Sequence, residues 1–268
     1  MNNLKKLKIA VITQADLYAI PRNFKLLCDS EIITISELII VNSKGSLGNN
    51  KFLFVKGFGI KQTINMAIKT LYLKFLACVA NKLKFLKKFQ WLDLKGLCSL
   101  NNIPYIIEED INSRRVLERL EKSNLDVIVS FSAPTVFKKN LLELPKYACI
   151  NLHCSALPSY SGVMPSFWVL SNNESTAGAS VHIMDSKIDN GDVLAQEVID
   201  ISHIDNMYEL IKTTKICGGK LMLDTLEYIQ MNRKLPDKVD TSHNEYGYYS
   251  WPTAKDFNEL LKKGKRLI

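Results

Sequence analysis

An amide, an imidazole and a carboxylate lie within one stretch of this sequence. Asn151 and His153 stand where an apolar run ends and a loop begins, and Asp189 follows on a turn beside Gly191. Residues two apart in a strand point to the same side, so Asn151 and His153 can project into one site. Such a trio suits acyl transfer to an amine. The imidazole accepts the proton of the attacking amine, the amide stabilises the oxyanion, and the carboxylate orients the imidazole and raises its pKa.

An Asn-x-His pair at a strand end is more often structural than catalytic. Its chemistry therefore depends on the strands and helices that position it. Apolar, β-branched runs predict buried strands, and amphipathic stretches predict helices between them. The predicted strands span 7–13, 32–35 or 38–41, 103–107 and 125–131, and the predicted helices span 20–28 and 113–121. This alternation predicts an α/β fold with a Rossmann-like, doubly wound, mostly parallel sheet and helices on both faces. Ligands bind at the carboxyl ends of such strands, here the loops after Thr13, Ser130 and Asn151.

The second half of the chain changes character. Predicted strands at 150–152 and 179–184 flank a loop rich in Pro, Ser and Gly at 156–165, and a helix follows from 205 or 206 to about 231 despite two adjacent glycines. The tail from Lys234 is polar and aromatic, and is too short for a second core. We expect a catalytic domain over 1–201 with a basic helical insert at about 56–98, and a short C-terminal helical and aromatic extension over 202–268.

The net charge of +8 comes from one segment. Residues 56–95 hold nine lysines and one acid, Asp93, and the other 228 residues carry 26 basic and 26 acidic side chains. Three interpretations remain open: a solvated amphipathic insert, a membrane-surface or partner-binding face, and a nucleotide or nucleic-acid contact. A pI near 9.0 arising from one helix is not enough to indicate nucleic-acid binding, so we expect no nucleic-acid partner.

Apolar residues recur at helical spacing within this basic segment. We expect them to form one buried face, with the lysines on the other. They are Leu71, Phe75, Leu76, Val79, Leu83 and Leu86. Packing against the domain or against a second subunit, in a possible homodimer, is favoured over contact with an anionic membrane surface.

The cysteines and the N-terminus bear on the compartment. The six cysteines are scattered, with no CxxC pair and no His at ligand spacing, which favours reduced thiols in the cytoplasm and no metal site. We expect an activity that needs no metal. The N-terminal residues lack the apolar core of a signal peptide, and no run of roughly 18 uninterrupted apolar residues predicts a membrane span.

The loop after His153 supplies the decisive pattern. The stretch 151–165, NLHCSALPSYSGVMP, resembles the signature N-x-H-x-S-x-L-P-x-x-x-G of the folate-dependent formyltransferases, in which a D-x-G turn follows after a strand. Here that turn is Asp189-Asn190-Gly191, preceded by VHIMD at 181–185. The similarity, to sugar-nucleotide N-formyltransferases and to the catalytic domain of methionyl-tRNA formyltransferase, is dense over about 125–201 and weak before 100. Several fixed spacings in the right strand and loop context make a specific signal.

The resemblance implies roles for individual residues. Asn151, His153 and Asp189 match the family's catalytic amide, imidazole and carboxylate, with 10-formyltetrahydrofolate as the formyl donor. Two loops would enclose the pterin with apolar walls and backbone polar groups. Their residues are Phe131, Ser132, Ala133, Pro134 and Val136 in the first, and Met184, Asp185 and Ile188 in the second. The first segment is otherwise an ordinary strand-to-helix connection.

The resemblance leaves the acceptor amine open. Members that act on methionyl-tRNA carry a further OB-like domain, for which we expect no room after Ile201, and those acting on glycinamide ribonucleotide have a glycine-rich loop after the first strand that is missing here. The stretch PSFW at 165–168 is typical of members that act on sugar nucleotides, so we expect a nucleotide-linked amino sugar. The expected contacts are Gln14, Tyr18, Tyr160, Trp168 and Tyr249. The tail aromatics could equally fasten the tail to the domain.

The same residues are compatible with functions other than formyl transfer, and two further side chains lie near the motif. A folate-binding module without transferase activity and a hydrolase that passes the formyl group to water are alternatives, as is formylation of another amine. His182 is interpreted as a core histidine with satisfied hydrogen bonds. Cys154 follows the predicted catalytic histidine, but its strand parity directs it away, so packing is its expected role.

Overall fold

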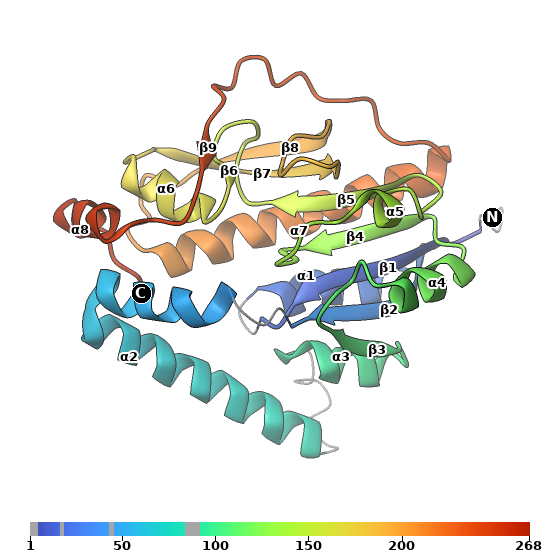
Figure 1. Ribbon diagram of the computed structural model, residues 1–268, viewed down its shortest axis with the longest axis horizontal. Coiled ribbons are helices and arrows are strands. Elements are labelled where there is room, and N and C mark those ends of the chain that lie inside the picture. The colour runs from blue at the N-terminus through green and yellow to red at the C-terminus, as the bar shows by residue number, and fades with distance from the viewer. Residues whose placement is uncertain (1–4, 17–18, 43–45, 84–91) are drawn as a thin grey trace.

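A seven-stranded sheet lies at the centre of the molecule (Figure 1). The computed structural model describes residues 5–16, 19–42, 46–83 and 92–268, with the backbone alone described for 46–54. The sheet has the order β3-β2-β1-β4-β5-β7-β8, and its strands are β1 (Leu7–Gln14), β2 (Ile33–Val41), β3 (Tyr105–Glu108), β4 (Val127–Phe131), β5 (Ala148–His153), β7 (Thr176–Ile183) and β8 (Val193–Asp200). The first five are parallel, and β7 and β8 are antiparallel to their neighbours.

The helices connect these strands and cover both faces of the sheet. They are α1 (Ile20–Asp29), α2 (Ser46–Lys82), α3 (Leu94–Leu100), α4 (Arg114–Lys122), α5 (Lys139–Leu142), α6 (Pro165–Ser171), α7 (Met207–Asn232) and α8 (Ala254–Lys262). A small parallel pair, β6 (Ser161–Gly162) and β9 (Tyr248–Tyr249), joins the loop after β5 to the C-terminal tail. The predicted Rossmann-like, mostly parallel fold with a C-terminal extension is confirmed.

Two local predictions differ from the structure. The runs 32–35 and 38–41 belong to the single strand β2, because an irregularity beside Ile9 and Ala10 of β1 absorbs one extra residue. Residues 46–50, whose polar and glycine-containing sequence is typical of a loop, form the first turns of α2 instead. Here tertiary packing further along the helix outweighs local polarity.

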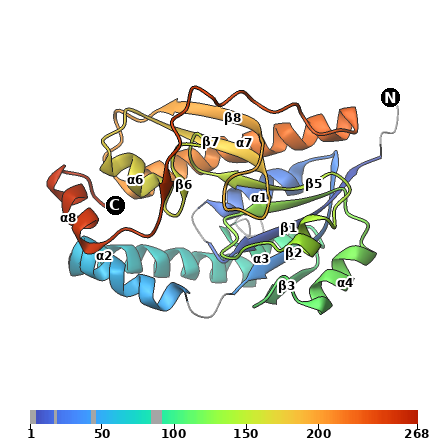
Figure 2. The same cartoon turned by 45° about the horizontal axis from the view of Figure 1, so that its top comes forward.

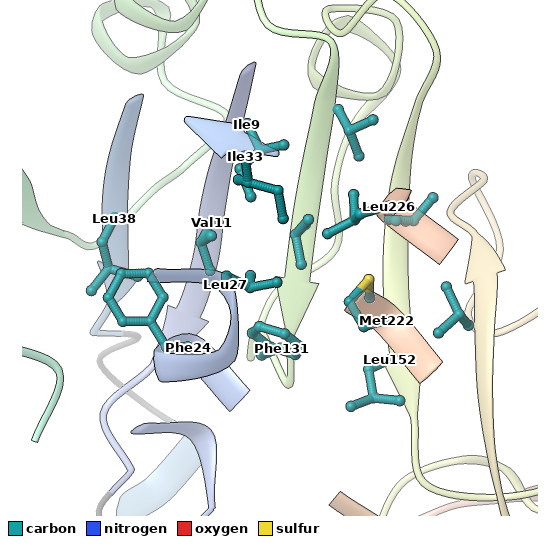
Figure 3. Close-up of a cluster of buried hydrophobic side chains, with 14 of the residues drawn as sticks. Ile9, Val11, Phe24, Leu27, Ile33, Leu38, Phe131, Leu152, Met222 and Leu226 are labelled. Atoms are coloured by element: carbon teal, nitrogen blue, oxygen red, sulfur yellow. The ribbon is translucent and has the colours of Figure 1, made fainter. Parts of the chain in front are cut away.

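Alternating side chains of the strands build two cores, one on each face of the sheet. Ile9 and Val11 face α1, α3 and α7, whereas Ala10 and Ile12 face α4 and α5. Figure 3 shows Phe24 of α1 and Met222 of α7 meeting the strand side chains on the first face. The period-2 alternation explains why central strands buried on both faces read as nearly continuous apolar runs.

A third apolar cluster fastens the C-terminal extension to the domain. Phe58 of α2, Phe167 of α6 and Phe257 of α8 meet there, with Phe257 in edge-on contact with Phe58 at 4.8 Å and with Phe167 at 4.9 Å between ring centroids. Edge-on aromatic pairs of this kind add stabilisation beyond their buried area. The extension and the start of the basic segment are therefore held on the same end of the molecule.

Helix α7 packs on the sheet itself, and its two glycines explain how. A Cβ atom added at Gly218 would collide with the Leu152 side chain of β5, and one added at Gly219 would collide with Asn23 of α1. Glycine costs helix stability but here permits a close approach to the strand that carries His153.

We expect Gly218→Ala to destabilise the protein. Overpacking a buried contact costs about 1–3 kcal/mol, and the gain in helix propensity returns about 1 kcal/mol of it. The free energy of unfolding, measured by urea denaturation, should fall by about 1–2 kcal/mol. Lys220→Ala, at an exposed position of the same helix, is the matched control and should change it by under about 0.5 kcal/mol. A Gly218→Ala protein as stable as the parent would contradict the close packing.

The basic helix α2 differs from expectation in the direction of its apolar face. It bends at Gly59, whose φ is +77°, and the second part continues to Lys82. Of the six residues predicted to be buried, Leu71, Phe75 and Leu83 are exposed, Leu76 and Val79 are half-buried, and Leu86 lies outside the described residues. The stripe does not pack against the domain, because this helix is apolar on two sides; its burial against a second subunit stays a prediction. The inner side, which includes Ala77 and Ala80, is the one that packs against the chain.

Helix α2 also differs from the expectation that no segment of this chain is apolar enough to span a membrane. Val55–Lys82 is long and apolar enough to cross a bilayer by length and composition alone, and 11% of its most apolar stretch is buried in the structure. The sequence criterion missed it because isolated lysines interrupt the apolar run.

Candidate active site

Three neighbouring strands bring the predicted catalytic groups together. Asn151 and His153 end β5, which lies between β4 and β7, and Asn151 is directly opposite His182 in the antiparallel pairing with β7. Asp189 stands on the turn after β7 with a left-handed backbone, φ +50°. β7 runs antiparallel to β5 and ends opposite Ile150, and the turn that follows brings the Asp189 carboxylate to the His153 ring.

His153 and Asp189 are in contact. Nδ1 of His153 lies 3.4 Å from Oδ2 of Asp189, and the same oxygen accepts a hydrogen bond of 2.9 Å from the Gly162 amide. Nε2 of His153 lies 2.9 Å from the carbonyl oxygen of Tyr160. Both ring nitrogens thus face acceptors, and a neutral ring, which carries one proton, donates to only one of them at a time.

A second imidazole completes this arrangement. Nε2 of His182 lies 3.5 Å from Oδ1 of Asp189 and 3.1 Å from Nδ2 of Asn151, and its Nδ1 lies 2.8 Å from the carbonyl of Ile183. Nδ1 of the ring thus faces that carbonyl, and Nε2 faces both the Asn151 amide and the Asp189 carboxylate. The predicted satisfied core histidine is indeed buried, but its partners are the predicted catalytic groups themselves.

His182 is therefore a site residue that sequence reasoning missed. The available signal was a histidine placed within an apolar strand just before the Asp189 turn. What could not be read was the antiparallel register, which sets His182 beside Asn151.

Burial and charge set the ionisation of this pair. Burial by itself raises the pKa of the Asp189 carboxyl, but the His153 and His182 rings and the Gly162 amide more than compensate and lower it to about 2. Burial lowers the pKa of the His153 imidazole below 6.5, and the attraction of Asp189 only partly offsets this. A carboxylate beside a neutral imidazole at neutral pH is the state a general base requires.

The predicted pterin loops lie on either side of β5. Ala133 and Met184 pack against the same core cluster around Cys149, and the Met184 amide donates to the Cys149 carbonyl at 2.8 Å. The remaining loop residues differ in exposure. Phe131 is buried in the other core, Ser132 has φ +53°, Pro134 is half-buried, Val136 and Ile188 are exposed, and Asp185 accepts hydrogen bonds from Lys187 and Asn190.

A cavity of about 290 Å³ opens at the same edge of the sheet. Gln14, Ser132 and Cys154, which follow β1, β4 and β5, line it together with a largely apolar wall. That wall includes Met66, Leu152, Met164, Phe167, Met207 and Ile211. Two cations, Lys212 and Lys215 of α7, also line it, and neither was singled out from the sequence.

Two polar side chains of this cavity, Lys215 and Cys154, are not available as a free cation and a nucleophile. Lys215 pairs with Asp16 at 3.7 Å, with both side chains largely buried. Burial raises the pKa of the Cys154 thiol, so this group stays protonated and is a poor nucleophile. Cys154 lines the cavity wall, and its packing role stays a prediction.

The predicted acceptor contacts divide into two groups. Gln14 lines the cavity, and Tyr18 lies outside the described residues. The rings of Tyr160 and Tyr249 stack at 5.0 Å, Trp168 lies 5.0 Å from Tyr249, and the Trp168 indole donates to the Ser250 carbonyl. These three rings fasten the C-terminal tail to the domain, and their contact with an acceptor stays a prediction.

No group of three or more His, Cys, Asp or Glu side chains within the described parts of the chain is placed to hold a metal ion.

Comparison with known proteins identifies this part of the chain. The family model described as formyl transferase matches residues 100–226, which hold Asn151, His153, His182 and Asp189. Residues 100–226 are therefore similar to the formyl transferases. The resemblance read from the sequence is therefore confirmed.

Relatives of this chain include a methionyl-tRNA formyltransferase of Clostridium novyi, 33% identical over 163 residues that make up 60% of this chain and 52% of that protein. The chain thus spans about half the length of such curated relatives. Among solved structures, a sugar N-formyltransferase from Shewanella sp. is similar with a TM-score of 0.59 and 14% identity, covering 96% of this chain and 87% of that one. A phosphoribosylglycinamide formyltransferase from Anaplasma phagocytophilum has the same TM-score and identity, covering 92% and 100%. At such identities the structures share the fold.

We expect the pKa of His153, followed by NMR of its ring protons, to lie below 6.5. Asp189→Asn should lower it further, because the negative charge that stabilises the imidazolium is removed. The exposed His203 in the same spectra is the control and should not respond to the substitution. A His153 pKa that rises in Asp189→Asn would show that the two groups are not coupled as the 3.4 Å contact requires.

Proposed function

We propose that this chain transfers a formyl group from a reduced-folate donor, 10-formyltetrahydrofolate, to a primary amine. The observation that carries the proposal is the convergence of Asn151, His153 and Asp189 at the end of β5, within the segment matched by the formyl transferase model. The donor would supply the formyl carbon and a nitrogen leaving group. The chain's own residues would handle the proton and the developing charge.

His153 would act on the amine. As the amine nitrogen bonds to the formyl carbon, its proton moves to Nε2 of His153, which would first have to leave the Tyr160 carbonyl. Asp189 would hold the ring through Nδ1 and stabilise the imidazolium. The same proton then passes to the departing donor nitrogen, which leaves the ring neutral again.

Asn151 would stabilise the negative charge on the formyl oxygen. Its amide is oriented by Nε2 of His182 at 3.1 Å, and His182 in turn contacts Asp189. A fixed donor costs no reorganisation when charge develops, which is why such groups contribute strongly to catalysis. His182 is in this view a positioning residue for both polar partners.

The donor would lie beside the loops 131–136 and 184–189. Ala133 and Met184 offer half-buried apolar surface, and the left-handed backbone at Ser132 and Asp189 turns main-chain polar groups away from the strands. Apolar walls with a few backbone donors and acceptors suit a flat heteroaromatic ring.

Substitution of the catalytic groups tests the proposal. His153→Ala, Asp189→Ala and Asn151→Ala should each lower turnover by at least about a hundredfold, the usual loss for a general base or an oxyanion donor. Formyl transfer would be followed by product mass, and circular dichroism would verify folding. His203→Ala is the matched control, since this histidine is exposed and remote from the site in sequence. Near-normal turnover in His153→Ala or Asp189→Ala would overturn the assignment.

For the acceptor, the relatives and the cavity favour methionyl-tRNA over the sugar nucleotide expected from the sequence. Curated relatives similar over 60% of this chain are methionyl-tRNA formyltransferases. The wall formed by Met164, Phe167 and Met207 suits an apolar side chain such as methionine. Lys212 is placed to meet a phosphate, and a tRNA acceptor would make a nucleic acid the partner, contrary to the expectation from charge.

A nucleotide-linked amino sugar is the second candidate. It rests on the PSFW stretch at 165–168 and on Lys212 of the cavity, which suits a phosphate of either acceptor, since Lys215 is paired with Asp16. The aromatic rings first assigned to this acceptor are occupied with one another, which removes part of its support.

Product mass after incubation with 10-formyltetrahydrofolate and either methionyl-tRNA or nucleotide-linked amino sugars would decide between them. We expect formylated methionyl-tRNA. Lys212→Ala should raise the KM for the acceptor about tenfold, the usual effect of losing one charged contact, without a similar change in kcat. The exposed Lys220→Ala on the same helix is the control. A formylated amino sugar with unmodified methionyl-tRNA would reverse the preference.

A further inference from the structure

The second part of α2 presents a continuous apolar face to solvent. Six large side chains on it are between 51% and 69% exposed. They are Ile60, Ile64, Ile68, Leu71, Tyr72 and Phe75. Their spacing of three or four residues places them on one side of the helix, about 15 residues long at this face, with Tyr72 at its margin. Isolated exposed apolar residues are ordinary, but a contiguous stripe of this kind marks a contact surface.

The orientation of this face is fixed by the opposite side of the helix. Ala77 and Ala80 are buried there, Met66 packs in the cluster with α6 and α8, and the Lys69 ammonium lies 3.4 Å from the centroid of the Tyr208 ring of α7. In Figure 1, α2 runs below the sheet along the outside of the molecule, and in Figure 2 its first part lies along the lower left edge. The apolar stripe therefore cannot turn inward without breaking these contacts.

Lysines surround the stripe. Lys61 and Lys82 stand at its two ends and Lys74 lies along one edge, all three exposed. They belong to the segment 56–95, whose nine lysines and single acid account for the whole net charge of +8. An apolar stripe bordered by long cationic side chains is the composition of a helix that lies in a membrane interface.

We propose that this face of α2 binds an anionic lipid surface. The apolar side chains would enter the boundary between headgroups and acyl chains, and the lysines would extend to the lipid phosphates. The helix axis would lie in the plane of the membrane, with the rest of the domain on the aqueous side. This goes beyond the proposed transferase activity and does not depend on it.

Charge separates a lipid surface from the other occupants. A second copy docked on the same stripe would bring two +8 segments together, and like charges at close range oppose such a pairing. A nucleic acid would neutralise the lysines but leave the apolar stripe facing water. A helix that spans the bilayer would have to release the inner contacts made by Ala77, Ala80 and Lys69.

Flotation of the full chain with vesicles tests the proposal. We expect co-flotation with vesicles that contain 30% phosphatidylglycerol in phosphatidylcholine, weak binding to pure phosphatidylcholine, and release by salt. Phe75→Trp keeps the apolar surface and supplies a reporter, whose fluorescence relative to the parent protein should shift to the blue on anionic vesicles. Brominated acyl chains should quench it.

Variants separate the apolar from the electrostatic part. Leu71→Ser with Phe75→Ser should lower the partition coefficient by at least about tenfold. Lys61→Gln with Lys74→Gln should lower it about fivefold for each charge removed. Controls are Met231→Ser, which changes an exposed apolar residue of α7, and Lys122→Gln, which changes an exposed lysine of α4. Neither control should alter binding.

Four results would overturn the proposal. They are the absence of flotation with anionic vesicles, equal flotation with neutral ones, and resistance of the bound chain to alkaline carbonate, which would indicate a spanning helix. The fourth is a concentration-dependent dimer of the parent protein, detected by analytical ultracentrifugation, that Leu71→Ser with Phe75→Ser abolishes. In that outcome neither the parent protein nor this variant binds vesicles.

Discussion

The buried Asp189 carboxylate is the group on which the arrangement of the site depends. A charge held away from water is stable only when partners replace its hydration, and here two imidazoles and the Gly162 amide do so. Each partner comes from a different part of the fold: His153 from β5, His182 from β7, and Gly162 from β6. The need to satisfy this one carboxylate thus couples the end of the sheet, the loop after His153 and the turn after β7.

The remaining architecture supports that edge of the sheet. Gly218 lets α7 approach Leu152, so the strand carrying His153 is backed closely by a long helix. The loop after His153 is tied down by the pairing of β6 with β9 and by the stacked rings of Tyr160 and Tyr249. The C-terminal tail, which contributes no polar group to the Asp189 contacts described above, therefore stabilises the loop from which Gly162 donates its hydrogen bond.

Helix α2 connects the candidate acceptor cavity to the outer surface. Met66 on its inner side lines the cavity, whereas Leu71 and Phe75 on its outer side face solvent. The same element would thus border the acceptor and meet a membrane. Lys69, held on the inner side over Tyr208, has a pKa lowered by burial and by the nearby Lys212. Lys212 lines the cavity and is repelled by the nearby Lys69, a charge arrangement that favours a phosphate-bearing acceptor.

The sequence by itself predicted the alternating strands and helices of the parallel part of the sheet and the resemblance to the formyltransferases, because period-2 and helical apolar patterns and the fixed spacings of NLHCSALPSYSG and D-x-G are local properties. It also placed Asn151 and His153 on one side of a strand. It did not predict β8 or the small pair β6 and β9. Only the tertiary structure decided that His182 lies against Asn151 and Asp189, since this follows from an antiparallel register between distant residues. The direction of the α2 stripe could not be predicted either. Either side of a helix that is apolar on two sides can pack against the core. Only the packing of the cluster formed by Phe58, Phe167 and Phe257 decides which side is buried.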